Sequence, residues 1–183
     1  MSKIAFVFPG QGSQYVGMCK AFYDQYPVAR QLFEEADDAL GFSLTKLCFE
    51  GPEAELRLTY NTQPAILTAS TICAEILKQH GAVADIAAGH SLGEYSALVN
   101  AGAMKFADAV RIVRQRGQFM QEAVPVGEGS MSAVMGLANE TIVELCQKVE
   151  AETGLPVQAV NFNCPGQVVI AGATAAVEKA NEE

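Results

Sequence analysis

Short apolar runs and longer amphipathic segments follow one another along the first two thirds of the chain, which is the pattern of an α/β protein. The apolar runs at residues 4–8 and 85–88 predict strands, the first of them buried, and a glycine-rich turn follows each. Helical spacing or composition predicts helices between the strands and after the second, at residues 16–26, 28–40, 61–80, 94–100 and 106–123, with short helical pieces over 43–60. We expect a parallel sheet from this order.

The segment that opens with Asn61 carries the clearest helix signals. Asn61 or Thr62 is a suitable N-cap, Pro64 then falls in the first turn, and Gly81 ends the helix. Its interior is apolar almost all round, so this helix is predicted to be buried.

The texture changes after a linker-like stretch around Pro125. Strands are predicted at 131–137, 156–163 and 167–171, with Asn139 and Thr174 as caps of two helices. The order β-α-β-β-α is one strand short of the ferredoxin-like unit. We therefore expect two subdomains, residues 1–125 with the parallel sheet and residues 126–183 with an incomplete ferredoxin-like fold.

Composition excludes several classes of function. The net charge is −9 and the chain holds no Lys/Arg cluster, which argues against nucleic acid and against anionic membranes as partners. No apolar run is long enough to span a membrane or to act as a signal peptide. The five Cys residues form no C-x-x-C pair and there are only two His residues, so no metal site is expected. Unpaired thiols suit a cytoplasmic protein.

Gly89-His90-Ser91-Leu92-Gly93 has the form G-x-S-x-G and lies between a predicted strand and a predicted helix. On such a turn the serine is strained and exposed, which suits an acyl-transfer nucleophile. The N–H of Leu92 lies at a helix N-terminus, where it can bind developing negative charge. The alternative is a glycine-rich turn with an ordinary surface serine.

A second glycine-rich turn surrounds Gln11. Both turns follow strands of one parallel sheet, so they project from the same edge, and the Gln11 turn could donate a second N–H to an oxyanion. A phosphate loop or a structural turn are the alternatives. No convincing general base is present, because His80 ends a helix and His90 adjoins Ser91 and so points elsewhere.

Arg114 and Arg116 flank the apolar stripe of the helix at 106–123, on opposite sides. A half-buried arginine suits bidentate capture of a carboxylate, and periodicity cannot choose between the two. A surface salt bridge is the plainer interpretation for either.

Together these stretches resemble the malonyl-CoA:acyl carrier protein transacylases of bacterial fatty acid synthesis. The resemblance runs from end to end of the chain. It rests on Phe8-Pro9-Gly10-Gln11-Gly12-Ser13-Gln14, Asn61-Thr62-Gln63-Pro64-Ala65, Gly89-His90-Ser91-Leu92-Gly93-Glu94-Tyr95, Gln115-Arg116-Gly117, and Asn161-Phe162-Asn163 with Pro165, Gln167 and Gly172.

The resemblance implies an α/β-hydrolase-like subdomain with a ferredoxin-like one, and a site with assigned roles. Ser91 takes the malonyl group from malonyl-CoA, the N–H groups of Gln11 and Leu92 form the oxyanion hole, and Arg116 pairs with the malonyl carboxylate. Gln63 and His90 belong near the pocket. The acyl group passes to acyl carrier protein, with no cofactor besides the coenzyme A thioester, in an enzyme that is a cytoplasmic monomer when full length.

Members of this family are longer than the present chain, and their catalytic His lies in the part beyond position 183. The expectation is therefore a portion of such an enzyme that is inactive alone and exposes apolar surface. The alternatives are an α/β-hydrolase-type thioesterase, an acyltransferase domain of a multidomain synthase, and a non-catalytic fragment that binds acyl carrier protein.

Overall fold

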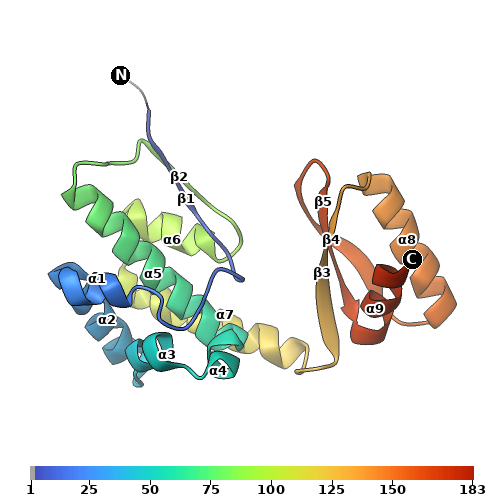
Figure 1. The fold of residues 1–183 in the computed structure, drawn as a ribbon, viewed down its shortest axis with the longest axis horizontal. Coiled ribbons are helices and arrows are strands. Elements are labelled where there is room, and N and C mark those ends of the chain that lie inside the picture. The colour runs from blue at the N-terminus through green and yellow to red at the C-terminus, as the bar shows by residue number, and fades with distance from the viewer. Residues whose placement is uncertain (1–2) are drawn as a thin grey trace. The chain divides into compact units, whose positions relative to one another are not determined.

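The computed structural model describes residues 3–183, which form two compact units divided between Gln121 and Glu122. Figure 1 shows the first unit as mostly helical with one strand pair, and the second as a sheet with two helices against it. The division falls four residues before the boundary that the sequence predicts at 125. Each unit is described by itself.

The strand pair of the first unit consists of β1 (Ala5–Phe8) and β2 (Ile86–Gly89). They run parallel, in register from Ala5 opposite Ile86 to Phe8 opposite Gly89. The predicted parallel sheet is therefore confirmed. Because Phe8 and Gly89 are partners, the turns that follow the two strands leave the sheet side by side.

The first strand is not buried as predicted. Phe6 and Phe8 point toward a small core with Ala74 and Ala97, whereas the alternate residue Val7 is 77% exposed and Ile86 on β2 is 64% exposed. Within residues 3–183, β1 and β2 pair only with each other, and only one face of the pair is covered. Exposed apolar surface is thus present on this unit, as expected.

Helices make up the rest of the first unit: α1 (Lys20–Gln25), α2 (Pro27–Leu40), α3 (Leu44–Glu50), α4 (Glu53–Arg57), α5 (Thr59–Gln79), α6 (Gly93–Asn100) and α7 (Phe106–Ala123). As predicted, Gly41 ends α2 in the left-handed conformation, and α5 is a buried helix. The helix predicted to begin at residue 16 begins at Lys20 instead, because Gly17 and Cys19 both have positive φ.

The predicted start of α5 is wrong by two residues. The helix begins at Thr59, and neither Asn61 nor Thr62 is its cap. Their side chains donate to the carbonyls of Glu55 (2.7 Å) and Leu56 (2.6 Å), so they tie α5 to the preceding helix α4. Pro64 therefore lies inside the helix and leaves the carbonyl of Tyr60 without its usual i+4 donor.

The second unit contains β3 (Gly129–Met135), α8 (Asn139–Thr153), β4 (Val157–Cys164), β5 (Gln167–Ala173) and α9 (Thr174–Glu182). The strands are antiparallel in the order β3-β5-β4, and α8 and α9 pack on the sheet around a core of their own. This is the predicted β-α-β-β-α arrangement of a ferredoxin-like fold.

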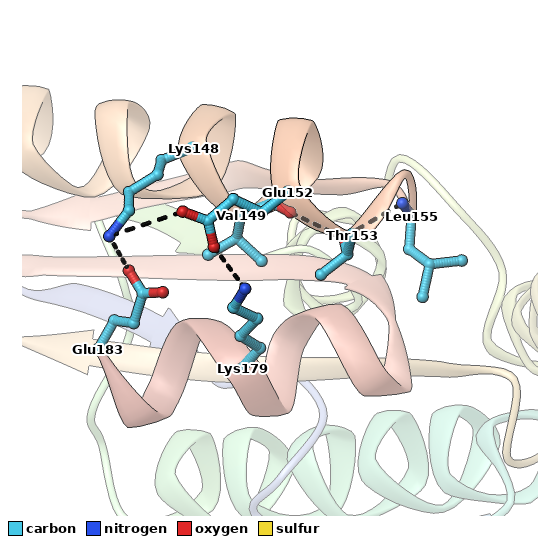
Figure 2. Close-up of polar contacts among 7 residues, drawn as sticks. All are labelled: Lys148, Val149, Glu152, Thr153, Leu155, Lys179 and Glu183. Carbon is cyan, nitrogen blue, oxygen red and sulfur yellow. Dashed lines mark hydrogen bonds and ion pairs between the residues drawn. The ribbon is translucent and has the colours of Figure 1, made fainter.

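The predicted caps of this unit are wrong. Ala138 and Ala173 precede the two helices, and the hydroxyl of Thr174 donates to the carbonyl of Gly127 (3.0 Å) instead of capping. Four charged side chains join the helices, as Figure 2 shows: Lys148 contacts Glu183 at 2.6 Å and Glu152 at 3.9 Å, and Lys179 pairs with Glu152. Thr153 closes α8 with a hydrogen bond to Val149.

Candidate active site

Ser91 occupies the turn between β2 and α6 with φ of +52°, a left-handed conformation that is rare for a residue with a side chain. The turn is held by backbone hydrogen bonds from His90 N–H to the Phe8 carbonyl (3.1 Å) and from Gly93 N–H to the His90 carbonyl (2.9 Å). Such strain persists only where the surrounding structure imposes it, and it is typical of functional turns. The side chain of Ser91 is exposed.

The two glycines of the pentapeptide are required by close backbone contacts. A Cβ on Gly89 would lie 1.9 Å from the carbonyl carbon of Gly93, and one on Gly93 would lie 2.2 Å from the Phe8 carbonyl oxygen. A Cβ on Gly10 would lie 2.9 Å from the His90 carbonyl oxygen. The turn after β1 and the turn that carries Ser91 therefore touch, as their parallel strands predict.

Arg116 reaches Ser91 from α7. Its Nη2 donates to Ser91 Oγ at 3.1 Å, and its Nη1 donates to Gln63 Oε1 at 2.7 Å. The guanidinium also lies 5.9 Å from the centre of the Tyr95 ring, at the start of α6. Three helices, α5, α6 and α7, thus contribute side chains around the serine.

The polar contacts continue from Gln63 to the other turn. Gln63, which is fully buried, donates from Nε2 to Thr59 Oγ1 (3.1 Å), and Thr59 Oγ1 donates to Gln11 Oε1 (2.8 Å). Sequence reasoning overlooked Thr59. The available signal was its spacing, because it lies one helical turn before Gln63 on the same face of α5.

Arg114 lies elsewhere, although it is only two residues from Arg116. Its Nη1 donates to the Tyr60 carbonyl (2.9 Å), the acceptor that Pro64 leaves unused, and to Asn61 Oδ1. Its guanidinium stacks between the rings of Phe42 (4.8 Å) and Tyr60 (4.7 Å). Burial lowers the pKa of Arg114. Arg114 therefore supplies a hydrogen-bond donor to the backbone of α5, and Arg116 is the arginine that contacts the serine.

Gly117 sets this difference. A Cβ there would lie 2.4 Å from Tyr60 Cα and 2.8 Å from the Thr59 carbonyl oxygen, so α7 and α5 touch through their backbones at this point. Arg114 contacts Tyr60 and Asn61 at the start of α5, whereas Arg116 contacts Gln63 and Ser91.

The other predicted site residues fall as follows. Leu92 is buried immediately before α6, so its backbone is at the helix N-terminus. Gln11 is exposed on the turn after β1. His90 is exposed, with Nδ1 toward Gly10. His80 caps the far end of α5, 3.5 Å from the Tyr26 hydroxyl, and is remote from Gln63 along the helix.

Within residues 3–183, no group of three or more His, Cys, Asp or Glu side chains could hold a metal ion. None of the helices that the structure describes is long and apolar enough to cross a membrane. The site consists of a strained serine, an arginine and a chain of neutral polar side chains, Gln63, Thr59 and Gln11.

A parallel strand pair, a strained serine at the strand-to-helix turn and an arginine beside it suit an acyl transferase. The family model for the acyl transferase domain matches residues 5–183, and the chain belongs to that family.

Similar proteins carry more specific names. The chain is 56% identical over 182 residues to the malonyl CoA-acyl carrier protein transacylase of Bacillus subtilis (strain 168), which covers all of this chain and 57% of that protein. It is 54% identical over 181 residues to the Escherichia coli (strain K12) protein of the same name, a match that covers 98% of this chain and 58% of that protein.

Solved structures of such proteins are also similar. A malonyl-transacylase in complex with a type II PKS acyl-carrier protein has a TM-score of 0.91 and 50% identity, over 99% of this chain and 58% of that one. The malonyl CoA-acyl carrier protein transacylase of Coxiella burnetii has a TM-score of 0.92 and 45% identity, over 98% of this chain and 57% of that one. The present chain thus spans little more than half the length of these relatives.

Proposed function

We propose that this chain carries the acyl-accepting serine and the substrate-selecting arginine of a malonyl-CoA:acyl carrier protein transacylase. The observation that carries the proposal is the contact of Arg116 with both Ser91 Oγ (3.1 Å) and buried Gln63 (2.7 Å). A cation held beside a strained serine suits an acyl donor with a free carboxylate. The names of the similar proteins support the same substrates.

The proposed reaction proceeds in two half-reactions. Ser91 Oγ attacks the thioester carbonyl of malonyl-CoA while its proton passes to a general base. The tetrahedral intermediate collapses with cleavage of the C–S bond, and coenzyme A leaves as the thiol after it takes a proton. The phosphopantetheine thiol of acyl carrier protein then attacks the malonyl-Ser91 ester in the reverse sense and releases Ser91.

The backbone N–H groups of Leu92 and Gln11 are proposed to bind the oxyanion of both tetrahedral intermediates. Leu92 is buried at the N-terminus of α6, and the Gln11 turn touches the Ser91 turn through Gly10 and His90. Removal of one preorganised oxyanion donor costs about 3 kcal/mol in activation free energy in acyl-transfer enzymes.

Arg116 is proposed to pair with the free carboxylate of the malonyl group. A guanidinium has several N–H donors in a planar fork, so it can keep its contact with Gln63 while it binds a carboxylate. An acetyl group leaves this half-buried cation without an anionic partner. Selection of malonyl over acetyl follows from that unpaired charge.

We propose that the general base is supplied by a residue outside positions 3–183. His80 lies at the far end of α5, and the Nδ1 of His90 is directed at Gly10. The 183-residue chain by itself is therefore expected to have little transfer activity, although it carries the proposed nucleophile, arginine and oxyanion donors.

Intact-protein mass spectrometry after incubation with malonyl-CoA tests these proposals. The chain is incubated alone and with a polypeptide that covers the remaining part of a curated relative, and the adduct is mapped by peptide analysis. We expect a malonyl adduct on Ser91 only in the mixture, and none in Ser91→Ala. Arg116→Ala should form relatively more acetyl adduct from acetyl-CoA, while Arg111→Ala, at an exposed arginine of the same helix paired with Asp108, should behave as the parent.

Each result has a definite meaning. An adduct in Ser91→Ala would refute the nucleophile, and an adduct without the second polypeptide would place the base inside this chain. Unchanged malonyl preference in Arg116→Ala would refute the carboxylate contact. No adduct under any condition would refute the proposed activity.

A further inference from the structure

Thr59 connects the two halves of the site and has no role in the scheme above. We propose that Thr59 is a positioning residue that fixes the amide of Gln63 and the turn of Gln11, and so joins the carboxylate-binding arginine to the oxyanion-binding turn. The inference rests on the proposed function for its catalytic meaning, but the positioning itself is a property of the free protein.

The direction of the hydrogen-bond chain follows from the chemistry of its first member. Arg116 can only donate, so Gln63 must present Oε1 to it and Nε2 to the other side. Gln63 Nε2 then donates to Thr59 Oγ1 at 3.1 Å. The single hydroxyl proton of Thr59 remains available for donation, and Thr59 Oγ1 donates it to Gln11 Oε1 at 2.8 Å. Thr59 is thus the member that accepts on one side and donates on the other.

Packing holds Thr59 in this place. It is the first residue of α5, and its carbonyl oxygen lies 2.8 Å from the position of a Cβ on Gly117. The same backbone contact between α5 and α7 that aims Arg116 at Ser91 therefore also locates Thr59. By contrast, Gln11 lies on an exposed turn, and its contact with Thr59 ties that turn to a helix in the core.

The loss of the hydroxyl would be felt on both sides. Gln63 is fully buried, and although its Nε2 also lies 3.4 Å from Met120 Sδ, a thioether is a weak acceptor. Without Thr59 Oγ1 a buried amide donor has no strong partner, which is costly. Gln11 loses the donor that fixes its side chain, and the turn proposed to bind the oxyanion loses that link to Arg116.

Nuclear magnetic resonance of the ¹⁵N-labelled chain tests this without any substrate. Thr59→Val keeps the shape of the side chain and removes the hydroxyl, whereas Thr59→Ser keeps the hydroxyl. In Thr59→Val we expect hydrogen exchange of the Gln63 side-chain amide to be about tenfold faster and the backbone order parameter at Gln11 to be lower. In Thr59→Ser both quantities should have the values of the parent protein. Thr71→Val is the matched control, because Thr71 bonds only its own helix, at the Leu67 carbonyl (2.9 Å).

Parent-like values at both Gln63 and Gln11 in Thr59→Val would overturn the inference, as would equal changes in Thr71→Val. Malonate, added as a probe, separates this result from the proposed function. In the parent protein it should shift the Arg116 Nε–H and Gln11 N–H signals, and in Thr59→Val only the first. If malonate leaves Arg116 unshifted, the carboxylate contact is wrong, while the ligand-free comparison still decides the role of Thr59.

Discussion

At the scale of single residues, backbone conformation and close contact explain the site better than residue type does. Ser91 is recognisable by its left-handed φ of +52°, and Gly89 and Gly93 by the backbone atoms that leave no room for a Cβ. The distinction between Arg114 and Arg116 is equally local. One meets the carbonyl that Pro64 leaves free, and the other meets Ser91.

A thiol pair supplies a pH-dependent prediction at this scale. A hydrogen bond from Cys19 lowers the pKa of Cys73 to about 7, although burial opposes it, and the same bond raises the pKa of Cys19. Because the thiolate is the reactive form, alkylation of Cys73 by iodoacetamide should rise with pH around a midpoint of about 7. The rate is measured by peptide mass spectrometry in a Cys164→Ser background, which removes another exposed thiol.

Cys19→Ala removes the bond that lowers the pKa and leaves the effect of burial. The midpoint should then move upward, past the ordinary value for a cysteine, whereas Cys19→Ser, which keeps a donor, should retain most of the downward shift. A midpoint that stays near 7 in Cys19→Ala would show that Cys19 does not stabilise the Cys73 thiolate.

At the scale of elements, the contact between α5 and α7 organises the site. Gly117 lets the two backbones meet at Tyr60. Arg114 of α7 donates to the Tyr60 carbonyl, which has no backbone donor because Pro64 lacks an N–H. Gln63 and Thr59 on α5 and Arg116 on α7 then lie within hydrogen-bonding distance of their partners. The polar chain is therefore a consequence of how the two helices pack.

Gly117→Ala should separate these helices. Alanine improves helix propensity by about 1 kcal/mol, but overpacking against backbone costs about 1–3 kcal/mol because no side chain can move aside. We expect a net loss in the free energy of unfolding, measured by urea denaturation, together with weaker contact between Arg116 and Ser91. Gln118→Ala, at an exposed position of the same helix, is the control for an alanine substitution without the close backbone contact. Equal or greater stability of Gly117→Ala would show that the close contact is not maintained.

At the scale of the molecule, each of the two units has a core of its own, and each leaves large apolar side chains exposed, among them Met131, Met135 and Phe162 in the second unit. The second unit has a self-contained core that includes Ile142, Val149, Val168 and Ile170. The first unit has a large helical core, yet it leaves Val7 and Ile86 exposed and carries a cavity of about 600 Å³ lined by β1, α1 and α5. We propose that they are separate subdomains, as the sequence predicted for residues 1–125 and 126–183.

A polypeptide of residues 122–183 should therefore fold without the first unit. Its core residues contact one another, but a domain of this size buries a modest fraction of its surface and should be only marginally stable. We expect a dispersed ¹H–¹⁵N spectrum and a cooperative urea transition at low denaturant concentration. A collapsed spectrum without a transition would show that the first unit is needed for it to fold.

Local sequence patterns predicted most of the secondary structure and its arrangement. The two apolar runs, the helical spacings and the change of texture after residue 125 predicted the α/β sheet and the β-α-β-β-α unit, because each pattern reflects an environment that repeats along one element. The caps were less predictable. Asn61, Thr62 and Thr174 all have capping side chains, but a neighbouring carbonyl was available to each and took the hydrogen bond instead.

The residues of the candidate site also fall into two groups, those that the sequence predicts and those that only the packing of helices places. Ser91 and its glycines follow from sequence alone, because strand, turn and helix are contiguous there and the strain is local. Arg116 and Thr59 do not, since their positions depend on segments about fifty residues apart that meet only when α5 packs on α7. Periodicity places a side chain on a face of its own helix, and only the packing of that helix determines what the face meets.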